Sequence, residues 1–197
     1  MEAPVDTPLD LPEPSQAPPV LASLSTTYQA EGSYLRILIA ALDSSPVDAV
    51  VTTGAGYDPA DFAPLPDNVV VRPYVPHGPL LNRAALMITH SGHGSVMAAL
   101  AHGVPLVCVP FARDQRDIAL RAVATGAALR LRPGGLTARK LSRAIEQVLE
   151  RPDYREAARR MQASLATEDG AGKAADEIAA VAVMLGRSST RFVSFAS

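Results

Sequence analysis

The chain lacks several features that would place it in a specialised class of protein. Its one cysteine, Cys108, lies in an apolar run, so no disulfide can form within the chain, and a reduced cytoplasmic setting is expected. No apolar run approaches the roughly 18–20 residues that cross a bilayer, so we expect no membrane span. The first residues are acidic and rich in proline, which fits neither a signal peptide nor a transit peptide.

Aromatic residues are also scarce. Five Tyr, four Phe and no Trp leave few rings for stacking on nucleic-acid bases, and no nucleic-acid-binding motif occurs. Residues 1–70 carry ten acids and one base, whereas residues 71–197 carry seventeen bases and ten acids. The basic second half either helps to attract phosphates or consists of solvated helix faces, and the second explanation is the simpler one. We therefore expect no nucleic-acid partner.

The composition that is present is that of a globular domain. Forty-eight per cent of the 197 residues are hydrophobic and 19 per cent are charged, which is enough apolar surface for a substantial core. Six of the seventeen prolines lie in residues 1–19, a density typical of an extended linker. We expect a linker over residues 1–18, one domain over residues 19–186 and a disordered tail over residues 187–197.

Apolar runs alternate with segments of helical spacing along most of the chain. Strands are predicted over residues 20–24, 47–52, 68–71, 85–89, 104–109 and 126–131. Helices are predicted over residues 31–42, 80–83, 94–101, 114–124, 137–149, 152–165 and 170–185. This alternation indicates an α/β fold, a Rossmann-like doubly wound parallel sheet of about six strands. Ligands of such sheets bind at the carboxyl ends of the strands, where Ser25, Thr53, Tyr74, His90 and Pro110 are expected.

The most informative segment is Thr89-His90-Ser91-Gly92-His93-Gly94-Ser95, a small-residue turn between an apolar strand and an Ala-rich helix. Such a turn leaves backbone N–H groups unpaired at the helix N-terminus, where a phosphate or diphosphate is favoured. Gly92, Gly94 and Ser95 would hold one phosphate, while the His90 ring donates to another and stabilises a departing diphosphate. Alternatively, His90 is a core histidine whose ring bonds a neighbouring carbonyl.

Two further histidines, His93 and His102, lie near this turn, but no carboxylate or cysteine accompanies them. A metal site is therefore not expected, nor is any other cofactor. Ser25 and Thr26 follow the first strand. Their hydroxyls either contact the phosphate or cap the next helix.

Two loops offer contacts for the rest of a nucleotide sugar. Asp114 and Gln115 combine a carboxylate with an amide that both donates and accepts, which suits vicinal sugar hydroxyls, although Asp114 also suits a helix N-cap. Tyr74 and His77 lie in a loop stiffened by proline. Tyr74 either stacks on a base, with the Val75 backbone bonding the base edge, or caps the core.

Taken together, residues 74–115 resemble the donor-binding half of family-1, B-type-fold glycosyltransferases. The matching segments, in order, are Tyr74-Val75-Pro76-His77, His90-Ser91-Gly92-His93-Gly94-Ser95, Ala99-Leu100-Ala101-His102-Gly103-Val104-Pro105, and Pro110 with Asp114-Gln115. Ser23-Leu24-Ser25-Thr26-Thr27 is similar to the first donor-domain strand and loop of bacterial members that act on natural products. The resemblance covers about residues 18–185.

The resemblance implies roles for individual residues. His90, Gly94 and Ser95 would bind the donor diphosphate, Asp114 and Gln115 the sugar, and Tyr74 and Val75 the base. His77 stands where many members carry a ribose-contacting Gln, and Ala98 stands where plant members have a ribose-binding Glu. UDP-sugars and dTDP-sugars are therefore both compatible with the sequence.

The resemblance also implies a second half. In this fold the catalytic base, a His supported by an Asp, belongs to an N-terminal acceptor domain, and this sequence contains no segment that resembles one. We expect the donor half of an inverting, metal-independent hexosyltransferase, with its acceptor domain in cis or in trans. The alternatives are a non-catalytic module that binds nucleotide sugars, and a relative of the N-acetylglucosaminyltransferases that act on lipid-linked precursors.

Overall fold

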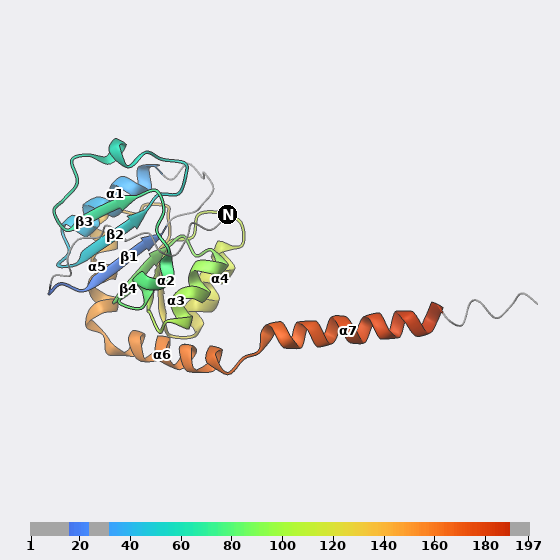
Figure 1. Cartoon of the computed structure of the whole chain (residues 1–197). Coiled ribbons are helices and arrows are strands. Elements are labelled where there is room, and N and C mark those ends of the chain that lie inside the picture. Colours follow the sequence, from blue (N-terminus) through green and yellow to red (C-terminus); the bar gives the residue numbers. More distant parts are fainter. Residues whose placement is uncertain (1–15, 24–31, 190–197) are drawn as a thin grey trace, which may run out of the picture. The chain divides into compact units, whose positions relative to one another are not determined.

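Six parallel strands form one sheet in a computed structural model that describes residues 16–23 and 32–189 (Figure 1). The strands are β1 (Pro19–Ser23), β2 (Asp48–Thr52), β3 (Val69–Arg72), β4 (Leu86–Thr89), β5 (Leu106–Cys108) and β6 (Ala128–Arg130). They lie in the order β3-β2-β1-β4-β5-β6, with every neighbouring pair parallel. This is the strand order of the doubly wound Rossmann fold. The sheet is built outward in one direction from β1 to β3 and in the other from β4 to β6, so the order of the strands reverses between β1 and β4.

The strands are connected by helices and one 3-10 turn. These are α1 (Gly32–Asp43), η1 (Pro59–Phe62), α2 (His77–Leu81), α3 (His93–Ala101), α4 (Gln115–Ala124), α5 (Ala138–Glu150), α6 (Pro152–Ala166) and α7 (Gly170–Ser189). The chain divides into two units, Met1–Ala163 and Ser164–Ser197, and the first contains the whole sheet. No helix in the described ranges is long and apolar enough to span a membrane.

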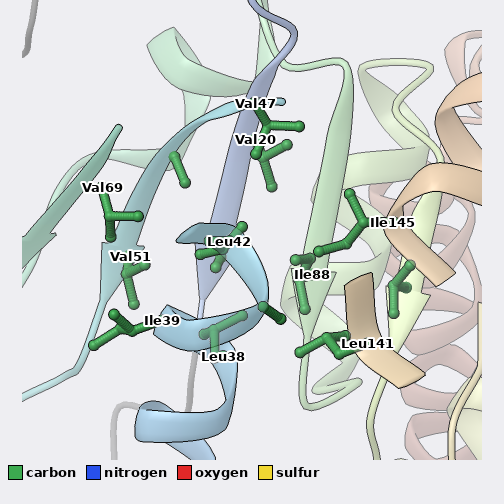
Figure 2. Close-up of a cluster of buried hydrophobic side chains, with 14 of the residues drawn as sticks. Val20, Leu38, Ile39, Leu42, Val47, Val51, Val69, Ile88, Leu141 and Ile145 are labelled. Carbon is green, nitrogen blue, oxygen red and sulfur yellow. The ribbon is translucent and has the colours of Figure 1, made fainter. Parts of the chain in front are cut away.

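The main core lies between the sheet and helices α1 and α5. Leu38 and Leu42 of α1 and Leu141 of α5 belong to one buried cluster, which Val51 and Ile88 join from the sheet (Figure 2). The intervening strand residues face the other way, and they include the fully buried Leu21, Met87 and Leu106. Both faces of the central strands are therefore covered, which is why these strands read as continuous apolar runs.

Helix α5 is the clearest match between the expected and observed elements. Thr137 caps it by accepting a hydrogen bond from the Lys140 N–H at 3.3 Å, as its position before the helical pattern predicts. Leu141, Ile145 and Val148 are buried along one face. The local sequence, its cap and its apolar face all favour the same helix.

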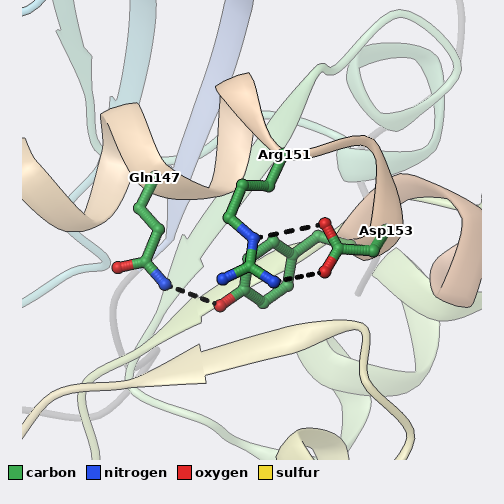
Figure 3. A network of polar contacts seen from close by, with 4 residues as sticks. Gln147, Arg151 and Asp153 are labelled. Carbon is green, nitrogen blue, oxygen red and sulfur yellow. Dashed lines mark hydrogen bonds and ion pairs between the residues drawn. The ribbon is translucent and has the colours of Figure 1, made fainter.

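Helix α6 begins one residue after Arg151, and its N-terminal part contacts the segments that lead into β4 and β5. At the junction, Arg151 donates to both carboxylate oxygens of Asp153, at 3.3 and 2.6 Å, and Gln147 donates to the Tyr154 hydroxyl at 2.9 Å (Figure 3). One turn further on, Arg155 donates to the carbonyls of Gly103 and Ala84 at 3.0 Å and of Ala85 at 3.2 Å. Arg155 therefore joins α6 to the segments that lead into both strands.

Several element boundaries differ from the expected ones for identifiable reasons. The strand predicted over residues 104–109 is shorter because the Val104 N–H closes helix α3 by bonding the Ala99 carbonyl at 2.9 Å. The strand predicted from residue 126 begins at Ala128, since Gly126 adopts a φ of +81° and ends the preceding turn. Helix α2 begins at His77, three residues earlier than expected, because Pro79 is accommodated in its first turn.

The last helix also extends beyond its expected end. The sequence predicts helix to residue 185 and a tail from residue 187, whereas α7 continues to Ser189. Residues 187–189 are therefore helical rather than part of the tail. The expected linker over residues 1–18 is described only from residue 16 onward.

Candidate functional site

The site residues gather at the carboxyl ends of the strands. His90 directly follows β4, Thr53 follows β2, and Pro110 and Tyr74 each lie two residues beyond the ends of β5 and β3. The reversal of strand order places β1 beside β4, and the crevice at such a reversal is where this class of sheet binds its ligands. His90 stands at that crevice.

The glycine turn presents a set of unpaired donors. Gly92 is the N-cap of α3, and no side chain accepts hydrogen bonds from the first turn of the helix. Within the described part of the chain, the first N–H of this turn that finds an acceptor is that of Val96, which bonds the Gly92 carbonyl at 3.0 Å. No acceptor for the N–H groups of His93, Gly94 and Ser95 occurs among the residues that the structure describes, and free N–H groups at a helix N-terminus are the arrangement that binds an anion.

Ser91 gives this turn its sharp bend. It adopts a φ of +71°, in the left-handed region that residues other than glycine rarely occupy, and it is fully buried. Its N–H donates to the Thr89 hydroxyl at 3.2 Å, which supports the unusual conformation. Sequence reasoning assigned Ser91 no role of its own, because a serine between a histidine and a glycine gives no local sign of positive φ.

His90 is buried, with 8% of its surface exposed. Burial lowers the pKa of its ring, and the nearby Arg113 charge lowers it further, while the Ser23 backbone and Asp114 act in the opposite direction. Nδ1 has no partner within hydrogen-bonding geometry among the described residues. Because Nδ1 is buried, a ligand oxygen would have to reach the ring through Nε2, and the phosphate contact by His90 stays a prediction.

Asp114 and Gln115 occupy adjacent but different environments. Asp114 stands at the N-cap position of α4 yet makes no side-chain capping bond, and it is exposed. The capping role considered for its side chain is therefore not observed. Gln115 is buried, and its Oε1 accepts hydrogen bonds from the Phe111 and Ala112 N–H groups at 2.8 and 3.0 Å. Gln115 shapes the loop before α4, and its contact with a sugar stays a prediction.

The loop after β3 contains Tyr74, Val75 and His77, the residues predicted to contact the base and the ribose. Tyr74 is 56% exposed, so it does not cap the core. The Val75 side chain is buried, while its backbone makes no hydrogen bond to another described residue. His77 begins α2, and burial lowers the pKa of its ring. Contacts of these residues with a base or ribose stay predictions.

The other candidate residues lie outside the described ranges or at the two ends of α3. Ser25 and Thr26 lie outside the described residues. His93 is exposed at the start of α3, and His102 ends the same helix, with Nδ1 2.8 Å from the Ala98 carbonyl oxygen. Over residues 16–23 and 32–189, no three His, Cys, Asp or Glu side chains gather as they would around a metal ion.

Sequence reasoning missed a hollow of about 540 Å³ beside the loop that follows β5. Its lining residues come from that loop, from the start of α4, and from β6 and the residues that follow it: Pro110, Phe111, Ala112, Arg113, Arg116, Arg130, Arg132 and Pro133. Four of the eight are arginines. The spacing of two residues between Arg130 and Arg132 is a weak local sign of a shared strand face, but nothing local connects them to Arg113.

Comparison with known proteins places this geometry in a family. The family model described as erythromycin biosynthesis protein CIII-like, C-terminal domain, matches residues 37–183. Demethyllactenocin mycarosyltransferase of Streptomyces fradiae is 35% identical over 161 residues, which cover 82% of this chain and 35% of that protein. The chain thus spans about a third of the length of this relative.

Solved structures give the same result for the fold. The calicheamicin glycosyltransferase CalG4 is 34% identical with a TM-score of 0.78, over 86% of this chain and 43% of that one. The glycosyltransferase VinC, solved in complex with dTDP, is 27% identical with a TM-score of 0.74, over 87% of this chain and 43% of that one. The sheet described above is therefore one half of the B-type glycosyltransferase fold, and the chain belongs to the erythromycin biosynthesis protein CIII-like C-terminal domain family.

Proposed function

We propose that the chain is the donor-binding half of an inverting, metal-independent glycosyltransferase. In this proposal it binds a nucleotide sugar whose hexose is transferred to a hydroxyl group of a small molecule. One observation carries the proposal: the N–H groups of His93, Gly94 and Ser95, which find no acceptor in the described part of the chain, lie next to the buried His90 at the reversal of strand order. The position, the free donors and the helix dipole together favour a diphosphate.

The reaction requires stabilisation of a leaving group. An acceptor hydroxyl attacks the anomeric carbon, the bond from that carbon to the diphosphate oxygen breaks, and the electron pair leaves with the nucleoside diphosphate. The α3 N-terminus and a hydrogen bond from His90 stabilise the negative charge that develops. Because burial lowers the pKa of His90, the ring acts at neutral pH as a neutral hydrogen-bond donor rather than as a cation.

The other parts of the donor are assigned to the two flanking loops. The exposed carboxylate of Asp114 contacts sugar hydroxyls, and Gln115 holds the loop that carries it. The exposed Tyr74 stacks on the base, whose edge bonds the Val75 backbone, and His77 lies toward the ribose. Ser25 and Thr26 add hydroxyls to the diphosphate. UDP-sugars and dTDP-sugars are both proposed, and the complex of VinC with dTDP supports the second.

In this proposal, the proton of the acceptor hydroxyl is taken up by a catalytic base on an acceptor-binding domain. Relatives are more than twice as long as the segment matched here, and the resemblance assigns their catalytic base to the acceptor-binding domain. We propose that such a domain joins this chain, either in cis within a longer protein or in trans as a separate subunit. The alternative is a module that binds nucleotide sugars without catalysis. Transfer activity measured after adding an acceptor domain from a relative separates the two.

Calorimetry with UDP and dTDP tests the central proposal. Binding of at least one is expected, and His90→Ala should weaken it by about 1–3 kcal/mol, the contribution of a hydrogen bond to a charged group. His102→Ala is the matched control, because this histidine lies at the opposite end of α3. Failure of both nucleotides to bind would contradict the proposal. Binding that is lost on adding a chelator would contradict its metal-independent form.

A further inference from the structure

We propose that the hollow lined by Arg113, Arg116, Arg130 and Arg132 is a second anion site, for a small molecule that carries carboxylate or phosphate groups. None of the residues assigned to the donor diphosphate lines this hollow. The inference therefore does not depend on the proposed function. It concerns a different ligand or a different part of a larger one.

The four arginines come together only through the fold. Arg113 lies in the loop just before α4 and Arg116 in its first turn, whereas Arg130 is the last residue of β6 and Arg132 follows two residues later. Parallel pairing of β5 with β6, in which Cys108 lies opposite Arg130, brings the two segments to one edge of the sheet. Positive charges from separate parts of the chain are thus concentrated around a single hollow.

These arginines differ from several others in having no partner among the described residues. Arg151 pairs with Asp153, Arg155 donates to three carbonyls, and Arg36 lies over the Phe62 ring and donates to the Asp61 carbonyl. None of the four lining arginines makes an ion pair or hydrogen bond to another residue that the structure describes. Four guanidinium groups around one hollow repel one another, and a bound anion would offset that repulsion.

The hollow is also framed rigidly. Pro110 and Pro133 restrict two of its edges, and Phe111 packs edge-on against Tyr34 with ring centroids 4.9 Å apart. The bonds from the Phe111 and Ala112 N–H groups to Gln115 fix the loop, and Arg113 is held at a φ of +56°. A residue held in this rarely occupied conformation next to a preformed hollow is typical of a ligand site.

The chemistry of the lining decides the class of ligand. Guanidinium groups form paired, parallel hydrogen bonds to the oxygens of carboxylates and phosphates, which a single ammonium group does not. A volume of about 540 Å³ is within the range of small-molecule pockets rather than of single-ion sites. The arrangement fits a polyanion such as a tricarboxylate or a phosphorylated small molecule.

The test uses the intact chain with inorganic phosphate and tricarballylate as probes. Titration followed by NMR should show saturable shifts at the backbone amides of residues 128–133 and 111–116. The double variant Arg130→Gln/Arg132→Gln should weaken this binding at least tenfold, while Arg139→Gln/Arg143→Gln, with the same change in net charge on α5, changes it less than twofold. The His90→Ala variant should leave these shifts unchanged. The phosphate and tricarballylate arms distinguish the two chemistries.

Melting temperature gives an independent readout. Without anions, Arg130→Gln/Arg132→Gln should melt no lower than the parent protein, because repulsion is relieved, and it should lose the rise in Tm that phosphate gives the parent. If that variant fails to fold, Arg113→Gln/Arg116→Gln serves in its place. Equal weakening by the α5 control, or shifts confined to residues 93–95, would overturn the proposal. Failure of both probes to bind would overturn it as well.

Discussion

Gly92 and His90 are in such close contact that a Cβ atom on Gly92 would lie 2.6 Å from Nε2 of the His90 ring. Gly92 has a φ of −61° and a ψ of 140°, which any residue can adopt, so the demand for glycine here comes from the ring and not from the backbone. Even the methyl group of an alanine at position 92 would therefore force the His90 ring to move.

Gly92→Ala is expected to displace the His90 ring and to weaken nucleoside diphosphate binding at least tenfold, or about 1.4 kcal/mol. Calorimetry measures the loss, and the ring resonances of His90 should shift in NMR spectra of the free protein. Gly134→Ala is the control, since nothing lies within 4 Å of its added Cβ. Unchanged binding in the Gly92 variant would show that the ring position does not matter for the nucleotide.

Stability should depend on pH through His90. The folded protein holds the pKa of this ring below 6.5, mainly by burial, whereas the unfolded chain protonates it near 6.5. As pH falls below 6.5, the unfolded state therefore binds more protons at this ring than the folded state does. The free energy of unfolding is highest above pH 6.5 and decreases as the pH falls to the pKa of the folded protein. Urea unfolding at pH 7.5 and 5.5 should show a smaller loss for His90→Gln than for the parent. An equal loss in both proteins would contradict this.

Gln115 is expected to be important for stability as well as for the loop that it holds. Gln115→Met keeps the size of the side chain but leaves the Phe111 and Ala112 N–H groups without their acceptor, so a destabilisation of about 2–3 kcal/mol is expected. Gln162→Met, at an exposed position on α6, should change stability by less than about 0.5 kcal/mol. Chemical denaturation compares the two variants, and similar values for both would refute the bracing role.

Arg155 should contribute more than an ordinary surface arginine. Arg155→Met removes the donors to three backbone carbonyls, and we expect a loss of about 2–4 kcal/mol in the free energy of unfolding. Arg159→Met, one turn along the same helix, serves as the control because Arg159 makes no hydrogen bond to a described residue. Equal effects of the two substitutions in urea would contradict the assignment.

Cys108 should be unreactive while the protein is folded. Burial raises the pKa of its thiol to about 11, against a smaller opposite effect of the Ser91 hydroxyl, so almost no thiolate is present at pH 8. A maleimide reagent should label the protein only in urea, since the side chain is fully buried. Labelling in native buffer at the rate of a free thiol would disprove the expectation.

Much of the fold can be read from local sequence patterns. The apolar run of β4 and the spacing of Leu141, Ile145 and Val148 in α5 each fix one element, because burial and periodicity are properties of a short segment. The ends of elements were harder to predict. Val104 looks like part of a strand, but its N–H is used to close a helix, and that choice depends on packing at the end of α3.

In the candidate site, too, some features follow from local sequence and others depend on how the chain packs. The His90 turn could be located because a strand end, two glycines and a helix start adjoin one another in the sequence. The use of Gln115 as a loop brace could not, since a long amide side chain has local partners in several directions. The hollow lined by arginines was beyond local reasoning, because Arg113 and Arg130 meet only through the pairing of β5 with β6.

The attachment of Arg155 to the chain on both sides of helix α3 has a mechanical consequence. It joins the segments that enter β4 and β5, whose opposite ends carry His90 and the loop from Pro110. With about 3.3 Å per residue, a four-residue strand places this clamp roughly 13 Å from the crevice. Since β4 and β5 are also paired directly, from Met87 opposite Leu106 to Thr89 opposite Cys108, the clamp and this pairing together set the relative position of the two segments that bound the crevice. A shortened chain that ends before α6 would keep the residues proposed to bind the donor and still lose their alignment.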